Sequence, residues 1–227
     1  PHDWSIEGEF GEKNPAGTGG GALPGGIGWD RKVFTLPDTV KQKLVFIEFD
    51  GVYRHSEVWI NGHYLGKRPY GYSSFEYELT PFLNYGSRKN VIAVKVDNSQ
   101  QPNSRWYSGS GIYRNVWLTT ADKIHVEHWG TYVTTPAISE QSATVKVITK
   151  IRNDSSNAAP VSLANIIYDA NRREVGRGLA HQLLERVDDE VGVLVAVDLV
   201  LGAHDTFELE RQAARLRTVD AVRQFST

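Results

Sequence analysis

The chain has 227 residues, with 25 Lys and Arg against 27 Asp and Glu, a formal net charge of −2 at pH 7. This balance excludes a strongly basic surface for nucleic acid, and no apolar run approaches the ~20 residues of a membrane-spanning helix. Cysteine is absent, which excludes disulfides, zinc–thiolate sites and a cysteine nucleophile. We therefore expect neither a nucleic-acid nor a membrane partner.

The chain opens on Pro-His-Asp-Trp, without Met and without the charged and apolar segments of a signal peptide. We interpret it as a fragment whose natural start lies upstream. The compartment is therefore open, with a periplasmic or secreted location favoured over the cytoplasm. Residues 14–28 are rich in glycine and lack periodicity, so they are predicted to form a surface loop or a backbone that closely approaches a ligand or another domain.

From Lys32 onward the pattern is that of β-strands. Asn61-Gly62 predicts a hairpin, because both positions accept positive φ. Clean alternation places Phe75, Tyr77 and Leu79 on one strand face, away from the intervening glutamates. The predicted strands are 32–36, 43–49, 56–60, 63–67, 75–79, 90–98 and 111–120. So many short strands with turn signals between them predict a jelly-roll sandwich over residues 1–121.

A domain boundary is expected near residues 121–123. The segments 123–135, 142–153 and 159–178 again alternate, and they predict the opening half of an immunoglobulin-like sandwich over residues 122–177. The expected fold class is therefore all-β, with an N-terminally truncated jelly-roll β-sandwich, a partial immunoglobulin-like β-sandwich and an atypical tail.

The tail, residues 178–227, differs in composition, because Trp and Tyr are absent after Tyr168 and Lys after Lys150. Residues 191–201 predict a strand, and residues 206–225 have helical spacing. No turn chemistry completes the sandwich. One hypothesis is that the tail is not the natural continuation, for example through a reading-frame error, which resequencing of the coding region would test.

Several stretches together resemble glycoside hydrolase family 2: residues 1–10, 25–34, 49–83, 90–98 and 105–118. Residues 1–121 are similar to the sugar-binding jelly roll of its β-galactosidases, and residues 122–177 to its immunoglobulin-like second domain. The resemblance implies that a catalytic (β/α)₈ barrel follows in the parent enzyme and supplies two glutamates, which retaining chemistry needs ~5 Å apart. That barrel, and the family's first strands upstream of residue 1, are missing from this sequence.

No catalytic residue is therefore assigned, and no cofactor is expected. The implied partners are a β-linked sugar substrate and the missing catalytic barrel, and the parent is a candidate homo-oligomer. Asp30 stands where relatives commonly carry Tyr. Loss of the first strands is expected to leave an unpaired sheet edge and exposed apolar surface.

The stretch NSRWYSGSGIYR, residues 103–114, carries the candidate site. Aromatic faces stack on the apolar faces of sugars, while Arg and Asn side chains hydrogen-bond sugar hydroxyls. In the family this loop reaches towards the active site of the barrel. The resemblance therefore makes Asn103, Arg105, Trp106 and Tyr107 candidate contacts with the substrate or the barrel mouth. Trp106 and Tyr107 have an alternative role as caps of the open end of the sandwich.

Other polar groups are interpreted as structural. We expect the His2–Asp3 turn to be structural with Trp4 buried, and Arg114 to form an ion pair. His125 and His128 lack a third metal ligand nearby, so no metal site is expected. The glutamates 57, 76 and 78 are predicted to be solvated surface groups, and Trp59 and Trp117 to be core residues.

Three functions remain open. The first is the non-catalytic N-terminal part of a β-galactosidase-type glycosidase, which supports and edges its active site. The second is a free-standing carbohydrate-binding module. The third is a structural sandwich that docks the barrel and helps the enzyme to oligomerise. The glycoside that is cleaved stays open, because galactosides, glucuronides and mannosides all occur in the family.

Overall fold

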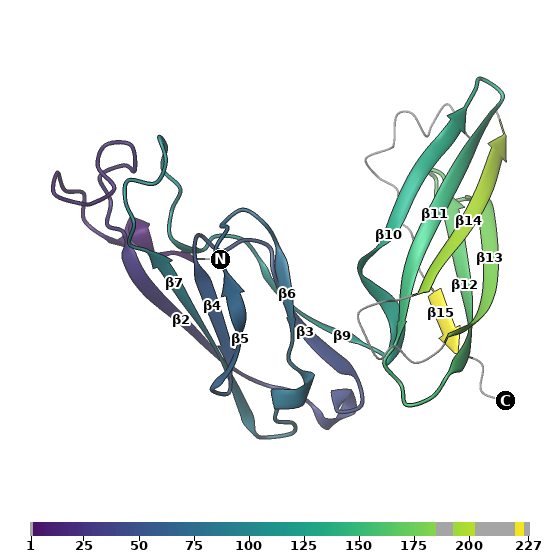
Figure 1. Cartoon of the computed structure of the whole chain (residues 1–227), viewed down its shortest axis with the longest axis horizontal. Coiled ribbons are helices and arrows are strands. Elements are labelled where there is room, and N and C mark those ends of the chain that lie inside the picture. The colour runs from purple at the N-terminus through teal and green to yellow at the C-terminus, as the bar shows by residue number, and fades with distance from the viewer. Residues whose placement is uncertain (1, 185–192, 203–220, 225–227) are drawn as a thin grey trace. The chain divides into compact units, whose positions relative to one another are not determined.

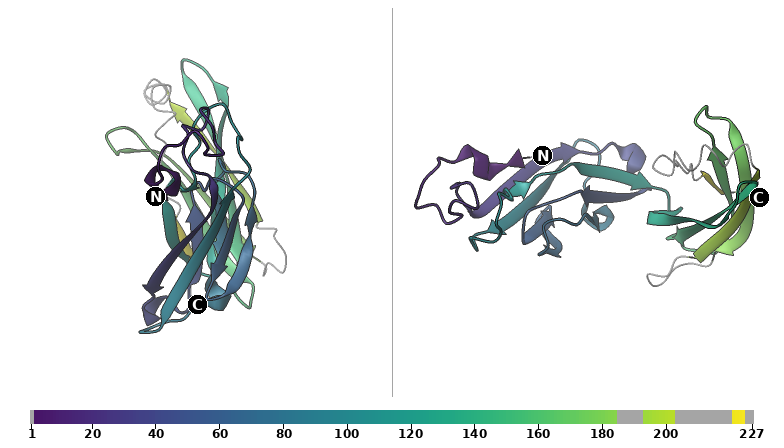
Figure 2. Two further views of the ribbon diagram at one scale, coloured as in Figure 1. Left: turned by 90° about the vertical axis from the view of Figure 1, so that its left-hand side faces the viewer. Right: turned by 90° about the horizontal axis from the view of Figure 1, so that it is seen from above.

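The computed structural model describes residues 2–184, 193–202 and 221–224. The chain divides into two compact units, Pro1–Ala121 and Asp122–Thr227, and each contains two β-sheets that lie face to face (Figures 1 and 2). Among the described residues, no helix is long and apolar enough to cross a membrane. Apart from three short 3-10 turns, the regular elements of the described residues are strands, as the sequence pattern predicted.

The first unit contains a four-stranded sheet, a three-stranded sheet and a short two-stranded ladder. The pairings between its strands are antiparallel. The four-stranded sheet has the order β2 (Gly26–Thr35), β7 (Lys89–Asn98), β4 (Ser56–Ile60), β5 (His63–Arg68). The three-stranded sheet has the order β6 (Phe75–Glu78), β3 (Leu44–Phe49), β9 (Val116–Ala121), and β1 (His2–Asp3) pairs with β8 (Gly111–Ile112). Single 3-10 turns form η1 (Trp4–Glu7), η2 (Asp38–Val40) and η3 (Thr80–Phe82).

Alternation of apolar residues along these strands builds the core between the two sheets. Every second residue of β3, β4 and β7 is buried, because successive side chains of a strand point to opposite faces. Asn61 and Gly62 have φ values of 50° and 86° in the turn between β4 and β5, which confirms the predicted hairpin. The core cluster contains Ile47, Phe49, Val52, Val58, Ile60, Phe75, Leu79, Ile92, Val94 and Val96.

We expected a single strand over residues 111–120, but the structure has two strands there. The segment breaks into β8 and β9, because residues 111 and 112 pair with β1 whereas Val116–Ala121 pair with β3. Between them the carbonyl of Asn115 accepts a hydrogen bond from the backbone N–H of Asp50. Arg114 lies exposed in this connection and has no ion-pair partner within the described residues, so the expected structural ion pair is not seen.

Two tryptophans that we had predicted to be core residues lie outside the core. Trp117 is 51% exposed. Trp59 faces away from the buried Val58 and Ile60, and its ring contacts those of Trp29 and Tyr64 with centroid distances of 5.2 and 5.3 Å. Residue type favoured burial, but strand alternation assigns Trp59 to the outer face of the sheet, where it joins an aromatic cluster.

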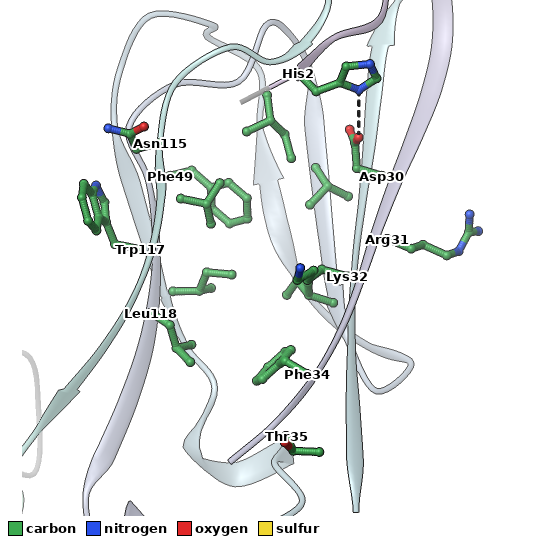
Figure 3. A pocket seen from close by; sticks show the side chains of 15 residues that line it. His2, Asp30, Arg31, Lys32, Phe34, Thr35, Phe49, Asn115, Trp117 and Leu118 are labelled. Carbon is green, nitrogen blue, oxygen red and sulfur yellow. Dashed lines mark ion pairs between the residues drawn. The ribbon is translucent and has the colours of Figure 1, made fainter. Parts of the chain in front are cut away.

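An open apolar cavity of ≈ 700 Å³ lies between the two sheets of the first unit, on the side of strands β2 and β9 (Figure 3). Phe34 and Phe49 point into it, whereas Arg31 and Trp117 point away (Figure 3). Among the described strands, β2 pairs only with β7 and β9 pairs only with β3. The cavity therefore opens beside two free sheet edges, which agrees with the expected unpaired edge and exposed apolar surface.

The second unit is also a sandwich of two antiparallel sheets. One sheet has the order β10 (Ile124–Ile138), β11 (Ser142–Asn153), β14 (Val193–Gly202), and the other has the order β13 (Glu174–Leu184), β12 (Ala159–Tyr168), β15 (Ala221–Gln224). Alternate residues of β11 and β12 are buried between them. The core cluster contains Ile124, Val145, Val147, Ile151, Ala159, Val161, Leu163, Ile167 and Leu184.

The described part of the tail belongs to these sheets. Strand β13 runs across the boundary expected after residue 177, so that position is not a break in the structure. Strand β14, predicted from residues 191–201, pairs with β11 over ten residues, from Val193 to Gly202. The helix predicted over 206–225 lies mostly outside the described residues, and its described part, Ala221–Gln224, is a strand instead.

Candidate functional site

The candidate site residues lie on the loop that connects β7 to β8, residues 99–110, which we call the 99–110 loop. The loop begins after Asn98, the last residue of β7, and ends at Ser110, just before β8. Both of these end residues are buried, with exposed fractions of 2% and 1%. The loop is therefore held at both ends by the sandwich and projects from its rim.

A buried polar network fixes the Ser110 end of the loop. The carbonyl of Ser110 accepts a hydrogen bond from the Trp4 N–H at 3.0 Å. The Ser110 hydroxyl accepts bonds from the Ser5 hydroxyl at 2.7 Å and from the Asn98 side-chain amide at 2.8 Å. Gly109 adopts φ +70°, and a Cβ at this position would lie 2.7 Å from an Asp3 carboxylate oxygen. This close approach requires glycine at position 109.

The carboxylate of Asp3 joins the start of the chain to the loop. Its Oδ1 accepts hydrogen bonds from the Ser110 N–H at 2.8 Å and from the Ser5 N–H at 3.1 Å, so it also caps the short turn η1. Its Oδ2 accepts a hydrogen bond from the Tyr107 hydroxyl. Burial raises the pKa of the Tyr107 phenol, and the hydrogen bond to Asp3 raises this pKa further. Tyr107 is therefore held in its protonated, donating form.

Asn98 fixes the other half of the loop. Its side-chain amide donates to the Gly109 carbonyl at 3.0 Å, and its Oδ1 accepts from the Asn103 side-chain amide at 2.6 Å. Asn103 also accepts a weak bond from the Ser108 hydroxyl at 3.4 Å. Asn103 and Tyr107 are therefore tied to two different residues beneath the loop.

The residues between these two ties form the exposed tip of the loop. Trp106 is 63% exposed, and Arg105 is exposed with no ion-pair partner within the part of the chain that the structure describes. Tyr107 is 41% exposed although its hydroxyl is engaged. The tip therefore presents an indole and a guanidinium to solvent, which are groups suited to stacking on a sugar ring and to hydrogen-bonding its hydroxyls.

The glycine-rich segment packs beside the 99–110 loop. Its backbone folds through hydrogen-bonded turns, such as Ala22 N–H to Gly17 O at 2.7 Å, and it buries Ala16 and Leu23. A Cβ at Gly19 would lie 3.5 Å from the Ser104 carbonyl, and one at Gly21 would lie 3.6 Å from the Tyr107 ring. The segment is thus folded against the 99–110 loop, a contact that its composition did not predict.

The structure separates the four predicted site residues into two kinds. Asn103 and Tyr107 bond to the base of the loop, whereas Arg105 and Trp106 are exposed. Trp4 was expected to be buried, but it is only half-buried. Sequence reasoning missed the roles of Asp3, Asn98 and Ser110. The one local signal was an Asp directly before a short turn, which is typical of a cap.

A comparison with known protein families matches most of the first unit to a known domain. Residues 23–122 match the family model "Glycosyl hydrolases family 2, sugar binding domain". A β-galactosidase of Bacteroides ovatus is 56% identical over 175 residues, which are 77% of this chain and 20% of that protein. A putative β-glucuronidase of Formosa agariphila is 45% identical over 152 residues, which are 67% of this chain and 14% of that protein.

Solved structures give the same result. A glycosyl hydrolase family 2 member from Bacteroides cellulosilyticus is 35% identical, with a TM-score of 0.82 over 89% of this chain and 26% of that one. A β-glycosidase from Bacteroides vulgatus is 36% identical, with a TM-score of 0.73 over 87% of this chain and 29% of that one. The chain spans 20% or less of the two curated relatives. It belongs to glycosyl hydrolase family 2 and contains the family's sugar-binding domain.

Proposed function

We propose that this chain is the non-catalytic, sugar-facing part of a β-galactosidase-type glycosidase, and that the 99–110 loop contacts a β-linked sugar at the mouth of a catalytic domain. The observation that supports this most is the exposed pair Arg105 and Trp106 at the tip of a loop whose base is buried and hydrogen-bonded. A rigid base with exposed aromatic and cationic groups favours ligand contact, because little conformational entropy is lost on binding.

The role of this region is to edge the active site and not to break the bond. Hydrolysis with retention needs two carboxyl groups only ~5 Å apart around the glycosidic oxygen. The carboxylate of Asp3, which bonds the loop residue Tyr107, already accepts hydrogen bonds from three donors, so we do not assign it as the acid or the nucleophile. The paired glutamates would come from the catalytic domain.

The β-galactosidase specificity is part of the proposal. It is supported by the 56% identity to the Bacteroides ovatus β-galactosidase, whereas a putative β-glucuronidase of Formosa agariphila is 45% identical. A glucuronide carries a carboxylate, and the exposed Arg105 would also suit that anion. The two substrates therefore have to be compared directly.

The test is kinetic and uses the complete glycosidase with aryl β-galactosides and aryl β-glucuronides. Trp106→Ala and Arg105→Ala should each lower kcat/KM by about tenfold, which corresponds to ~1.4 kcal/mol. Trp129→Ala and Arg88→Ala are matched controls, because Trp129 is 68% exposed and Arg88 is exposed, and neither lies on the loop. Unchanged kcat/KM in both loop variants would refute the proposed contact. A preference for glucuronides would refute the β-galactosidase assignment alone.

A further inference from the structure

Tyr107 differs from its two neighbours at the tip of the 99–110 loop. The hydroxyl that would contact a sugar is already bonded to the Asp3 carboxylate, 104 residues away in the sequence. Asp3 in turn holds the backbone N–H of Ser110 at 2.8 Å. The Asp3 carboxylate therefore forms hydrogen bonds with the loop at two points, which are the Tyr107 side chain near the tip and the Ser110 backbone at the end of the loop.

A second hydrogen bond fixes the opposite half of the loop, and we call this bond and the one between Tyr107 and Asp3 the two ties of the loop. Asn103 is bonded to Asn98 at 2.6 Å, and Asn98 is 2% exposed. Only residues 104–106 lie between the two ties, and the Ser104 hydroxyl donates to the Trp106 carbonyl across this short span. Because three residues between two fixed ends have few conformations, the direction of the Trp106 indole depends on both ties.

Asp3 is itself held by the sheet structure and not by the loop alone. It pairs with Gly111 in the ladder between β1 and β8, and the adjacent Trp4 N–H bonds to Ser110 O at 3.0 Å. Its carboxylate also accepts from the Ser5 N–H, and Ser5 is 2% exposed. The grip on Tyr107 thus comes from a part of the chain that the first unit holds in place.

From this geometry we infer that Asp3 is a positioning residue: through the Tyr107 hydroxyl it fixes the direction in which Trp106 and Arg105 face the sugar. The inference rests on the proposed function of the loop and changes the role of Tyr107, which acts as a tie and not as a sugar contact. The raised pKa of the Tyr107 phenol agrees with this, because the hydroxyl keeps its proton and its bond to Asp3 into alkaline solution.

The first experiment measures the orientation of Trp106 and does not depend on any enzymatic activity. The chain is labelled with 5-fluorotryptophan, its six tryptophans are observed by ¹⁹F NMR, and Trp106 is assigned with Trp106→Phe. Asp3→Asn and Tyr107→Phe should each move the Trp106 resonance towards its position in the unfolded chain. Tyr107→Phe removes a single hydroxyl, so it remains informative if Asp3→Asn fails to fold.

Glu7→Gln is the matched control. Glu7 is an exposed carboxylate in the same N-terminal segment that bonds His2 and does not touch the loop. This variant should leave the Trp106 resonance in place. The inference is overturned if the resonance stays in place in both Asp3→Asn and Tyr107→Phe, or if Glu7→Gln moves it equally.

The second experiment measures the effect on the sugar in the complete glycosidase. Asp3→Asn and Tyr107→Phe should each raise KM about tenfold and change kcat less than twofold, because misdirected binding groups weaken substrate and transition state alike. The double variant should be no worse than the poorer single variant, because both changes cut the same tie. Additive effects on KM would overturn the inference. Unchanged kcat/KM in both Trp106→Ala and Arg105→Ala would instead refute the proposed function, and the NMR result would still decide the role of Asp3.

Discussion

The strongest quantitative prediction concerns Asn98, the buried residue under the 99–110 loop. Replacing it with alanine removes the bonds from its amide to Gly109 O and the Ser110 hydroxyl, and the bond that its Oδ1 accepts from Asn103. Each such bond contributes roughly 1 kcal/mol net, and a buried group left unpaired costs about 1–3 kcal/mol. Because Asn103 can bond to water instead, we expect Asn98→Ala to lower the free energy of unfolding by about 2–3 kcal/mol.

The assay is urea unfolding of the chain followed by tryptophan fluorescence, which reports chiefly on the first unit because only Trp129 lies outside it. With a slope of about 1–3 kcal/mol per molar urea, the midpoint should fall by roughly 0.7–3 M. Ser108→Ala is the matched control: it loses only a weak 3.4 Å bond to Asn103 at a half-buried position of the same loop and should cost less than about 1 kcal/mol. A midpoint that is equal in the two variants would refute the view that Asn98 holds the base of the loop.

Two further predictions concern stability and association. Burial lowers the pKa of His125, against the opposing effect of Asp154, so the unfolded chain binds this proton more readily than the folded one. The second unit should therefore lose stability as the pH falls below the ordinary value of 6.5 towards the lowered pKa. His125→Gln should remove that loss in thermal unfolding followed by circular dichroism at pH 7 and below, and an unchanged pH dependence would contradict this. Among the described strands, the outer edge of β9 beside the apolar cavity has no partner, so it should make the chain prone to associate, and Val116→Lys, at a position 40% exposed on that edge, should reduce light scattering. Equal scattering by Val116→Lys and the parent chain would show that another surface drives association.

Local patterns predicted much of the fold. The hairpin at Asn61-Gly62 could be predicted because two adjacent residues that tolerate positive φ require little else to turn the chain. Strand faces followed from alternation, as in β7, where Ile92, Val94 and Val96 are buried. The strand in the tail was predicted by its apolar, β-branched composition alone. These features depend on residues close in sequence.

The features that sequence reasoning missed depend on distant partners. The break at Asn115 arises because β8 and β9 pair with different strands. Trp59 was misassigned because residue type was given more weight than its alternation with Val58 and Ile60. The loop was recognised as a candidate site, but its ties to Asp3 join residues more than 100 positions apart, and no local pattern indicates such a contact.

The contact between the 99–110 loop and the sugar can be tested by a structure of the complete protein with a slowly hydrolysed β-galactoside analogue in its active site. We predict that the Trp106 ring lies within about 4.5 Å of the sugar, with the Arg105 guanidinium at hydrogen-bond distance and Tyr107 still bonded to Asp3. A bound sugar that touches neither Arg105 nor Trp106 would contradict the central claim that this loop edges the sugar site.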